Sequence, residues 1–93
     1  DKSLVADSDY IDTTIRALAN GESFNNIRQI IADAYVNDYE GLFSALYKRA
    51  NEYAPGKEGT IAILINDHQY KANFRIDKEI NIMSLIQQIL NNK

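Results

Sequence analysis

The sequence lacks cysteine and tryptophan, and it contains one proline and one histidine. Without cysteine there is no disulfide framework, no thiolate zinc site and no cysteine nucleophile, a composition consistent with a reducing compartment. The single histidine, His68, excludes a histidine-rich metal site. No apolar run approaches the roughly 18 residues of a membrane-spanning helix. We therefore expect a cytoplasmic protein with no membrane partner.

Basic charge is also scarce, because 10 Lys and Arg residues face 13 Asp and Glu residues, for a net charge of −3 at pH 7. Proteins that bind by neutralising phosphates usually carry a basic balance, so this composition disfavours a nucleic-acid-binding function. The chain has 93 residues, of which 45% are hydrophobic and 25% charged. These values predict a single small globular domain over residues 1–93. The chain begins at Asp1 and not at methionine, and we expect it to be a fragment of a longer protein.

Apolar residues recur at spacings of three and four along most of the chain, which is the pattern of amphipathic helices. Asn20-Gly21, Asn37-Asp38 and Ala54-Pro55-Gly56 interrupt the pattern and mark turns. The pattern predicts helices over residues 8–20, 24–34, 39–53, 57–74 and 79–91. The residues expected to be buried in a shared core are Ile27, Ile31, Leu46, Leu64, Ile82 and Ile86.

The stretch after Gly59 allows two interpretations. Residues 60–65 are rich in β-branched side chains and could form a strand, with a turn at Asn66-Asp67 and a second strand over 68–76. Alternatively, residues 57–74 form one helix, and one of its faces is lined by Ile61, Leu64, Ile65, His68 and Ala72. A lone two-stranded hairpin is marginal, and no other strand pair in the sequence could extend it. We therefore predict an all-α fold, a single small five-helix bundle.

Motifs that carry chemistry are weak in this sequence. Gly56-Lys57-Glu58-Gly59-Thr60 lacks the Gly-Lys-Thr order of a phosphate-binding loop. Asp7, Asp9 and Asp12 could ligate a hard cation, but acidic residues in a first helical turn more commonly oppose the helix dipole in solvent. His68 lies among isoleucine and leucine, which favours a histidine at the edge of the core with one hydrogen bond. No catalytic residue set, cofactor site or metal site is predicted.

Tyrosine is the most suggestive residue type, with six in the chain beside three phenylalanines. Tyr47 and Tyr70 each precede a lysine on a helix whose other face is committed to the core. Small basic spots near tyrosines could support base stacking, but the acidic balance favours a solvated helix face. Tyrosine is favoured at protein interfaces, because it contributes contact area at low entropic cost together with a hydroxyl group. We therefore predict that Tyr47 and Tyr70 belong to a subunit interface.

The C-terminal third resembles the tail of the small subunits of DNA-polymerase sliding-clamp loaders. Asp67-His68-Gln69-Tyr70-Lys71 is followed, after a gap, by Asp77-Lys78-Glu79-Ile80-Asn81-Ile82 and an apolar helix to the end. Upstream, 15–18, Gly21, 27–34 and 39–47 are similar to the order of helices in that family. The likeness extends from about Val5 to Leu90 and is closest to the replication factor C-like subunit of phages.

This resemblance implies an all-helical C-terminal collar domain of a longer AAA+ ATPase. In the family, five subunits assemble through a ring of collars, and their ATPase domains bind ATP and Mg²⁺, open the sliding clamp and load it onto primer–template DNA during replication. The fragment itself would be an oligomerisation platform without enzymatic activity or cofactor. Its partners would be the other loader subunits. If the source is a phage, it would act in the cytoplasm of the host cell. The alternative function is a helical adaptor or nucleic-acid-binding module unrelated to clamp loading.

Overall fold

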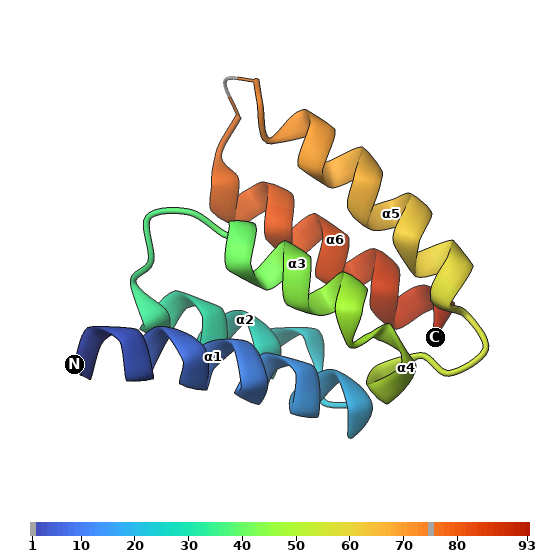
Figure 1. Ribbon diagram of the computed structural model, residues 1–93, viewed down its shortest axis with the longest axis horizontal. Coiled ribbons are helices and arrows are strands. Elements are labelled where there is room, and N and C mark those ends of the chain that lie inside the picture. The colour runs from blue at the N-terminus through green and yellow to red at the C-terminus, as the bar shows by residue number, and fades with distance from the viewer. Residues whose placement is uncertain (1, 75) are drawn as a thin grey trace.

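The computed structural model describes the backbone of residues 2–74 and 76–93, and side chains from Asp9 onward with the same gap. It contains six helices and no strand among the described residues, so the all-α prediction is confirmed and the count of five helices is wrong (Figure 1). The helices are α1 (Lys2–Ala19), α2 (Phe24–Ala34), α3 (Glu40–Lys48), α4 (Ala50–Tyr53), α5 (Glu58–Lys71) and α6 (Lys78–Asn92). The helix α1 begins at Lys2, before the predicted start at Ser8.

The turn between α1 and α2 follows from its sequence. Gly21 has a φ of 74°, a left-handed conformation that glycine adopts without a Cβ clash. The Glu22 amide donates to the Ala17 carbonyl at 3.0 Å and the Gly21 amide to the Leu18 carbonyl at 3.2 Å, the bonds of a Schellman motif. The Ser23 side chain then accepts a hydrogen bond from the Asn26 amide and caps α2.

The additional helix arises from a break at Arg49, where φ is −109° and ψ is 21°. Arg49 forms ion pairs with Asp12 on α1 at 2.9 Å and with Glu52 on α4 at 2.8 Å. The Tyr53 hydroxyl donates a 2.6 Å hydrogen bond back to the Leu46 carbonyl at the end of α3. These contacts turn α4 away from the axis of α3 and fasten it to α1, so the predicted helix over residues 39–53 is two helices.

The ambiguous stretch after Gly59 is the helix α5, so the strand alternative is wrong. Ile61, Ile65 and His68 are buried, as predicted, whereas Leu64 and Ala72 on the same predicted face are only partly buried. The helix ends at Lys71, before the predicted end at Phe74. The Asn81 side chain donates a 2.9 Å hydrogen bond to the His68 carbonyl and thereby ties α6 to the end of α5.

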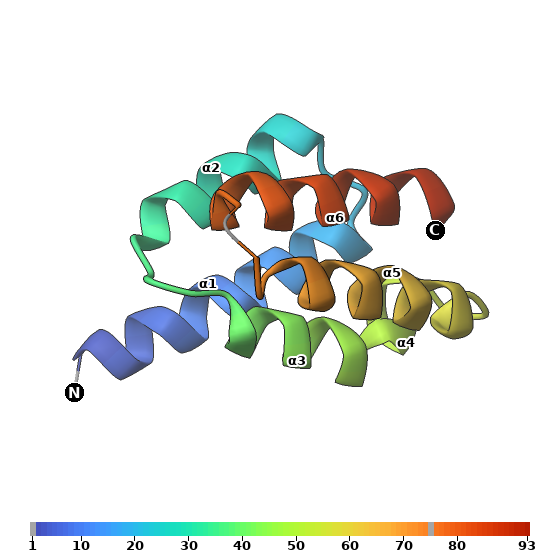
Figure 2. The same ribbon diagram turned by 90° about the horizontal axis from the view of Figure 1, so that it is seen from above.

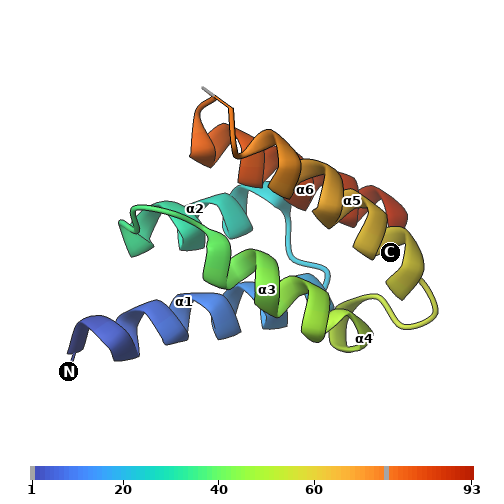
Figure 3. The ribbon, with the colours of Figure 1, turned by 45° about the horizontal axis from the view of Figure 1, so that its top comes forward.

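The helices pack in a closed ring around one core, in the order α1, α2, α6, α5, α3 and back to α1. Figure 2 shows α2 beside α6, with α3 and α4 next to α5, and Figure 3 shows α5 running along α6. Five of the six predicted core residues are buried. Leu64 is the exception and is only partly buried, because it lies at the edge of the face that Ile61 and Ile65 place toward the core.

Candidate protein-interaction surface

The acidic residues near the start of α1 serve as ion-pair partners. Asp12 accepts hydrogen bonds from Arg16 and from Arg49, and these hydrogen bonds hold the pKa of the Asp12 carboxyl below its usual value. Asp9 is exposed, and the side chain of Asp7 lies outside the described residues. Among the described residues, no group of three or more histidine, cysteine or acidic side chains could hold a metal ion. Asp12 therefore acts as an ion-pair partner that links α1 to Arg49 at the start of α4.

The surroundings of His68 and of the loop that contains Gly56 are those of core packing and of a turn. His68 is 2% exposed, so it lies within the core and not at its edge as predicted. Its Nδ1 atom lies 2.9 Å from the Leu64 carbonyl oxygen. Gly56 has a φ of 84° and lies in the turn that joins α4 to α5. A phosphate-binding loop follows a buried strand, whereas this turn follows a helix.

The two small basic spots near the tyrosines are Lys48-Arg49 and Lys71 with Arg75, and acidic neighbours pair with one cation of each. Arg49 is held by Asp12 and Glu52, and Lys71 forms an ion pair with Asp67 at 3.0 Å. Arg75, the remaining member of the spot near Tyr70, lies outside the described residues. Lys48 beside Tyr47 is exposed, so within the described part of the two spots Arg49 and Lys71 are paired with carboxylates and Lys48 is the further cation.

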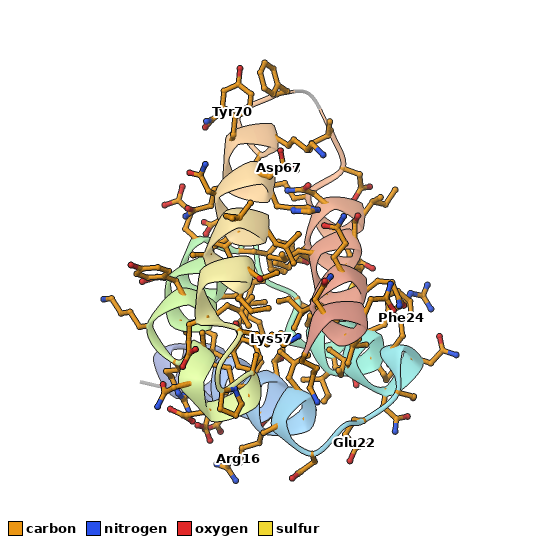
Figure 4. All side chains as sticks on the ribbon, turned by 90° about the vertical axis from the view of Figure 1, so that its right-hand side faces the viewer. Arg16, Glu22, Phe24, Lys57, Asp67 and Tyr70 are labelled. Carbon is orange, nitrogen blue, oxygen red and sulfur yellow. The ribbon has the colours of Figure 1, made fainter. Side chains whose placement is uncertain are left out.

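The structure places both predicted interface tyrosines on the surface. Tyr47 on α3 is 61% exposed and Tyr70 on α5 is 63% exposed. Tyr47 lines a groove between α3 and α5, together with Phe43 and Asn66. Figure 4 shows Tyr70 at the end of α5 that is remote from Arg16 and Glu22.

Three exposed apolar side chains extend the surface around Tyr70. The ring of Tyr70 packs edge to face on Phe74, with ring centroids 5.1 Å apart. Ile63 precedes Tyr70 by two helical turns, so both side chains lie on the outer face of α5. Ile63 and Phe74 are exposed. We name Ile63, Tyr70 and Phe74 the aromatic ridge, and Ile76 is a further exposed apolar side chain just beyond it.

The ridge residues other than Tyr70 were not predicted from the sequence. The signal that could have found them is a helix with two apolar faces. Ile61, Ile65 and His68 follow the spacing of one face, and Ile63 and Tyr70 follow the spacing of the opposite face. A helix that lies at the surface of a monomer usually has one apolar face and one polar face, and α5 departs from that pattern.

Comparison of the chain with protein-family models, with curated proteins and with solved structures finds no match. Within the described residues, no helix is both long enough and apolar enough to cross a membrane. The surface itself is therefore the basis for a functional assignment, together with the family resemblance of the sequence.

Proposed function

We propose that this chain is the oligomerisation collar of a replication factor C-like clamp-loader subunit, of the phage type. In this role it holds neighbouring subunits of an AAA+ ATPase together while their ATPase domains load the sliding clamp onto primer–template DNA. ATP and Mg²⁺ belong to those domains, and the collar contributes packing and no chemistry. The proposal is supported by the order of sequence motifs from Val5 to Leu90 and by the all-helical fold.

The aromatic ridge is the single observation that carries the proposal. The inner face of α5 already buries Ile61, Ile65 and His68 in the core. The outer face still exposes Ile63 and Tyr70, and Phe74 continues the exposed surface beyond the end of the helix. Tyr70 and Phe74 are in contact, and Ile63 lies on the same outer face two helical turns away. Exposed aromatic and aliphatic side chains gathered on one face are a common mark of a protein-binding surface, because their contact with water costs free energy that a partner relieves.

A ring of collars requires heterologous contacts, in which two different surfaces of each domain meet. The aromatic ridge and the groove beside Tyr47 would supply one of these surfaces. Neither tyrosine supports the core of its own domain, since both rings lie largely in solvent. A charge at either position is therefore expected to weaken assembly and leave the fold of the collar intact.

The test uses the longer protein to which the resemblance assigns this chain. Tyr47→Asp and Tyr70→Asp should each lower the assembled mass in sedimentation velocity, because a buried unpaired carboxylate is costly at an interface. Tyr70→Phe retains the ring and is the matched control that should assemble normally. Circular dichroism melts of the 93-residue chain should give nearly equal melting temperatures for all variants.

Two results would refute the proposal. One is full assembly and full clamp loading by a protein from which residues 8–90 have been deleted. The other is sub-micromolar, salt-sensitive binding of duplex DNA by the 93-residue chain, which would favour the nucleic-acid-binding alternative.

A further inference from the structure

A pocket of ≈ 320 Å³ lies where the start of α3, the end of α5 and the start of α6 meet. Tyr39, Phe43 and Asn81 contribute to its lining from the buried side, and Asp38, Glu40 and Lys78 contribute exposed charged groups. None of these residues belongs to the aromatic ridge. The inference drawn from this pocket is therefore independent of the proposed collar function.

Two polar side chains in the pocket are more than nine-tenths buried. Tyr39 is 8% exposed and Asn81 is 7% exposed. Asn81 donates its Nδ2 hydrogen to the His68 carbonyl, which fixes the carboxamide and leaves its Oδ1 atom as an acceptor. Neither this Oδ1 atom nor the Tyr39 hydroxyl forms a hydrogen bond with any residue that the structure describes. Among the described residues Thr14 Oγ1 is the only fully buried side-chain polar atom without a partner, so these two atoms retain access to solvent at the pocket. They are open acceptors and are suited to a ligand that donates hydrogen bonds.

The charges around the pocket favour a cationic ligand. Asp38 and Glu40 line it, and the carboxylates of Glu79 and Asp77 lie close enough to Tyr39 to add to the effect of burial in raising the pKa of its hydroxyl. Lys78 is the opposing charge on the lining. Asp38 and Asp77 each use one oxygen to accept amide hydrogens at the starts of α3 and α6, which leaves the second oxygen of each.

The end of α5 adds to this preference. The last carbonyl groups of a helix carry partial negative charge, and α5 ends at the pocket. The positive ends of α3 and α6 are offset by the carboxylates of Asp38 and Asp77. The lining therefore offers at least three acceptors, which are the Tyr39 hydroxyl, the Asn81 carboxamide oxygen and the Glu40 carboxylate.

We propose that this pocket binds the guanidinium group of an arginine side chain carried by a partner protein. A guanidinium is planar and presents five N–H donors in a fixed fork, so it can serve several separate acceptors at once. The aromatic and aliphatic lining of Phe43 and Ala72 accommodates the methylene stem of the arginine. An ammonium group has three donors on one atom and satisfies fewer of these acceptors.

The probe for this site is N-acetyl-L-arginine amide, titrated into the 15N-labelled 93-residue chain and followed by 1H–15N correlation spectra. We expect saturable shifts of the Asn81 side-chain amide and the Tyr39 backbone amide, with a dissociation constant on the order of 1 mM. The matched neutral probe, N-acetyl-L-citrulline amide, has nearly the same shape and no charge, and it should not saturate these signals in the same range. Equal shifts with both probes, or no saturable shift with the arginine probe, would overturn the proposal.

Matched variants separate the pocket from general surface charge. Glu40 and Glu58 are each the first residue of a helix, and only Glu40 lines the pocket. Glu40→Gln should weaken binding about threefold to fivefold, whereas Glu58→Gln should leave it unchanged. Lys78→Gln should tighten binding because it removes the opposing charge. Equal effects of the two glutamate variants would contradict a defined site, as would weaker binding by Lys78→Gln.

Discussion

Replacing Tyr53 with phenylalanine tests how the break between α3 and α4 is stabilised. The Tyr53 hydroxyl donates a 2.6 Å hydrogen bond to the Leu46 carbonyl, and the tyrosine is 3% exposed. In an unbroken helix this carbonyl would accept from the Ala50 amide, but among the described residues no amide across the break donates to it. Tyr53→Phe retains the packed ring and leaves the Leu46 carbonyl without a partner.

The expected cost is about 1–3 kcal/mol of unfolding free energy, the range for a buried acceptor left unsatisfied. That is a substantial share of the roughly 5–15 kcal/mol that stabilises a domain. Urea unfolding monitored by circular dichroism should show a lower midpoint with an unchanged slope. Tyr39→Phe is the matched control, because it removes the hydroxyl of another largely buried tyrosine, one that has no hydrogen bond to a described residue and retains access to solvent. It should change the unfolding free energy by less than about 0.5 kcal/mol.

The same variant has a second signature at alkaline pH. Burial raises the pKa of the Tyr53 hydroxyl above its ordinary value of 10.0. The folded protein then holds this proton more tightly than the unfolded chain does. The stability that the protonated Tyr53 hydroxyl contributes is therefore present below pH 10 and is lost as the pH rises further. Tyr53→Phe should flatten that alkaline loss. A cost below about 0.5 kcal/mol together with an unchanged alkaline profile would show that the hydrogen bond does not stabilise the break.

Three further predictions concern the core and the ion pairs. Leu46→Ala should lower the free energy of unfolding by about 2–5 kcal/mol in denaturant melts, and Leu64→Ala should lower it less because the Leu64 side chain is only partly buried. Equal losses for the two variants would contradict the assignment of the buried helix faces. Thr14→Val should stabilise the fold by about 1 kcal/mol in the same assay, since the buried Thr14 hydroxyl oxygen has no hydrogen-bond partner among the described residues, and a destabilised variant would refute this. Hydrogen bonds from Arg16 and Arg49 lower the pKa of Asp12, and two hydrogen bonds from Arg49 lower the pKa of Glu52. The stability that these two carboxylates contribute is present above their unfolded pKa values and is lost as the pH falls below about 4. Acid titrations should show a smaller loss of stability in Arg49→Met.

Local sequence patterns predict the helices well where caps and periodicity agree. Gly21 and Asp38 lie in the turns that the sequence predicts, and Asp38 accepts a hydrogen bond from the Glu40 amide at the start of α3. For α5 the helix prediction is correct despite the β-branched residues, because the sequence contains no further strand pair that could extend a hairpin. Local patterns fail at Arg49, where no breaker residue stands and the break depends on contacts with Asp12 and Tyr53 made only in the folded chain.

The surfaces are predicted less well than the core, for a physical reason. Tyr47 and Tyr70 can be identified as outward because their helices have evident inner faces. The pocket could not be predicted, since Tyr39 and Asn81 are distant in the sequence and meet only when α3 and α6 converge on the end of α5. Leu64 was assigned to the core because periodicity defines a face to within one residue, and consecutive residues project about 100° apart.

The ring of helices has a consequence for the order of folding. α1 packs on α2 and α5 packs on α6, so each pair is an αα-hairpin whose members are adjacent in the chain. Short loops close at low entropic cost, and either hairpin can form early. The contact between α2 and α6 joins the two hairpins across the length of the chain and is expected to form last. Substitutions at that contact should therefore accelerate unfolding and leave the refolding limb of the chevron plot nearly unchanged.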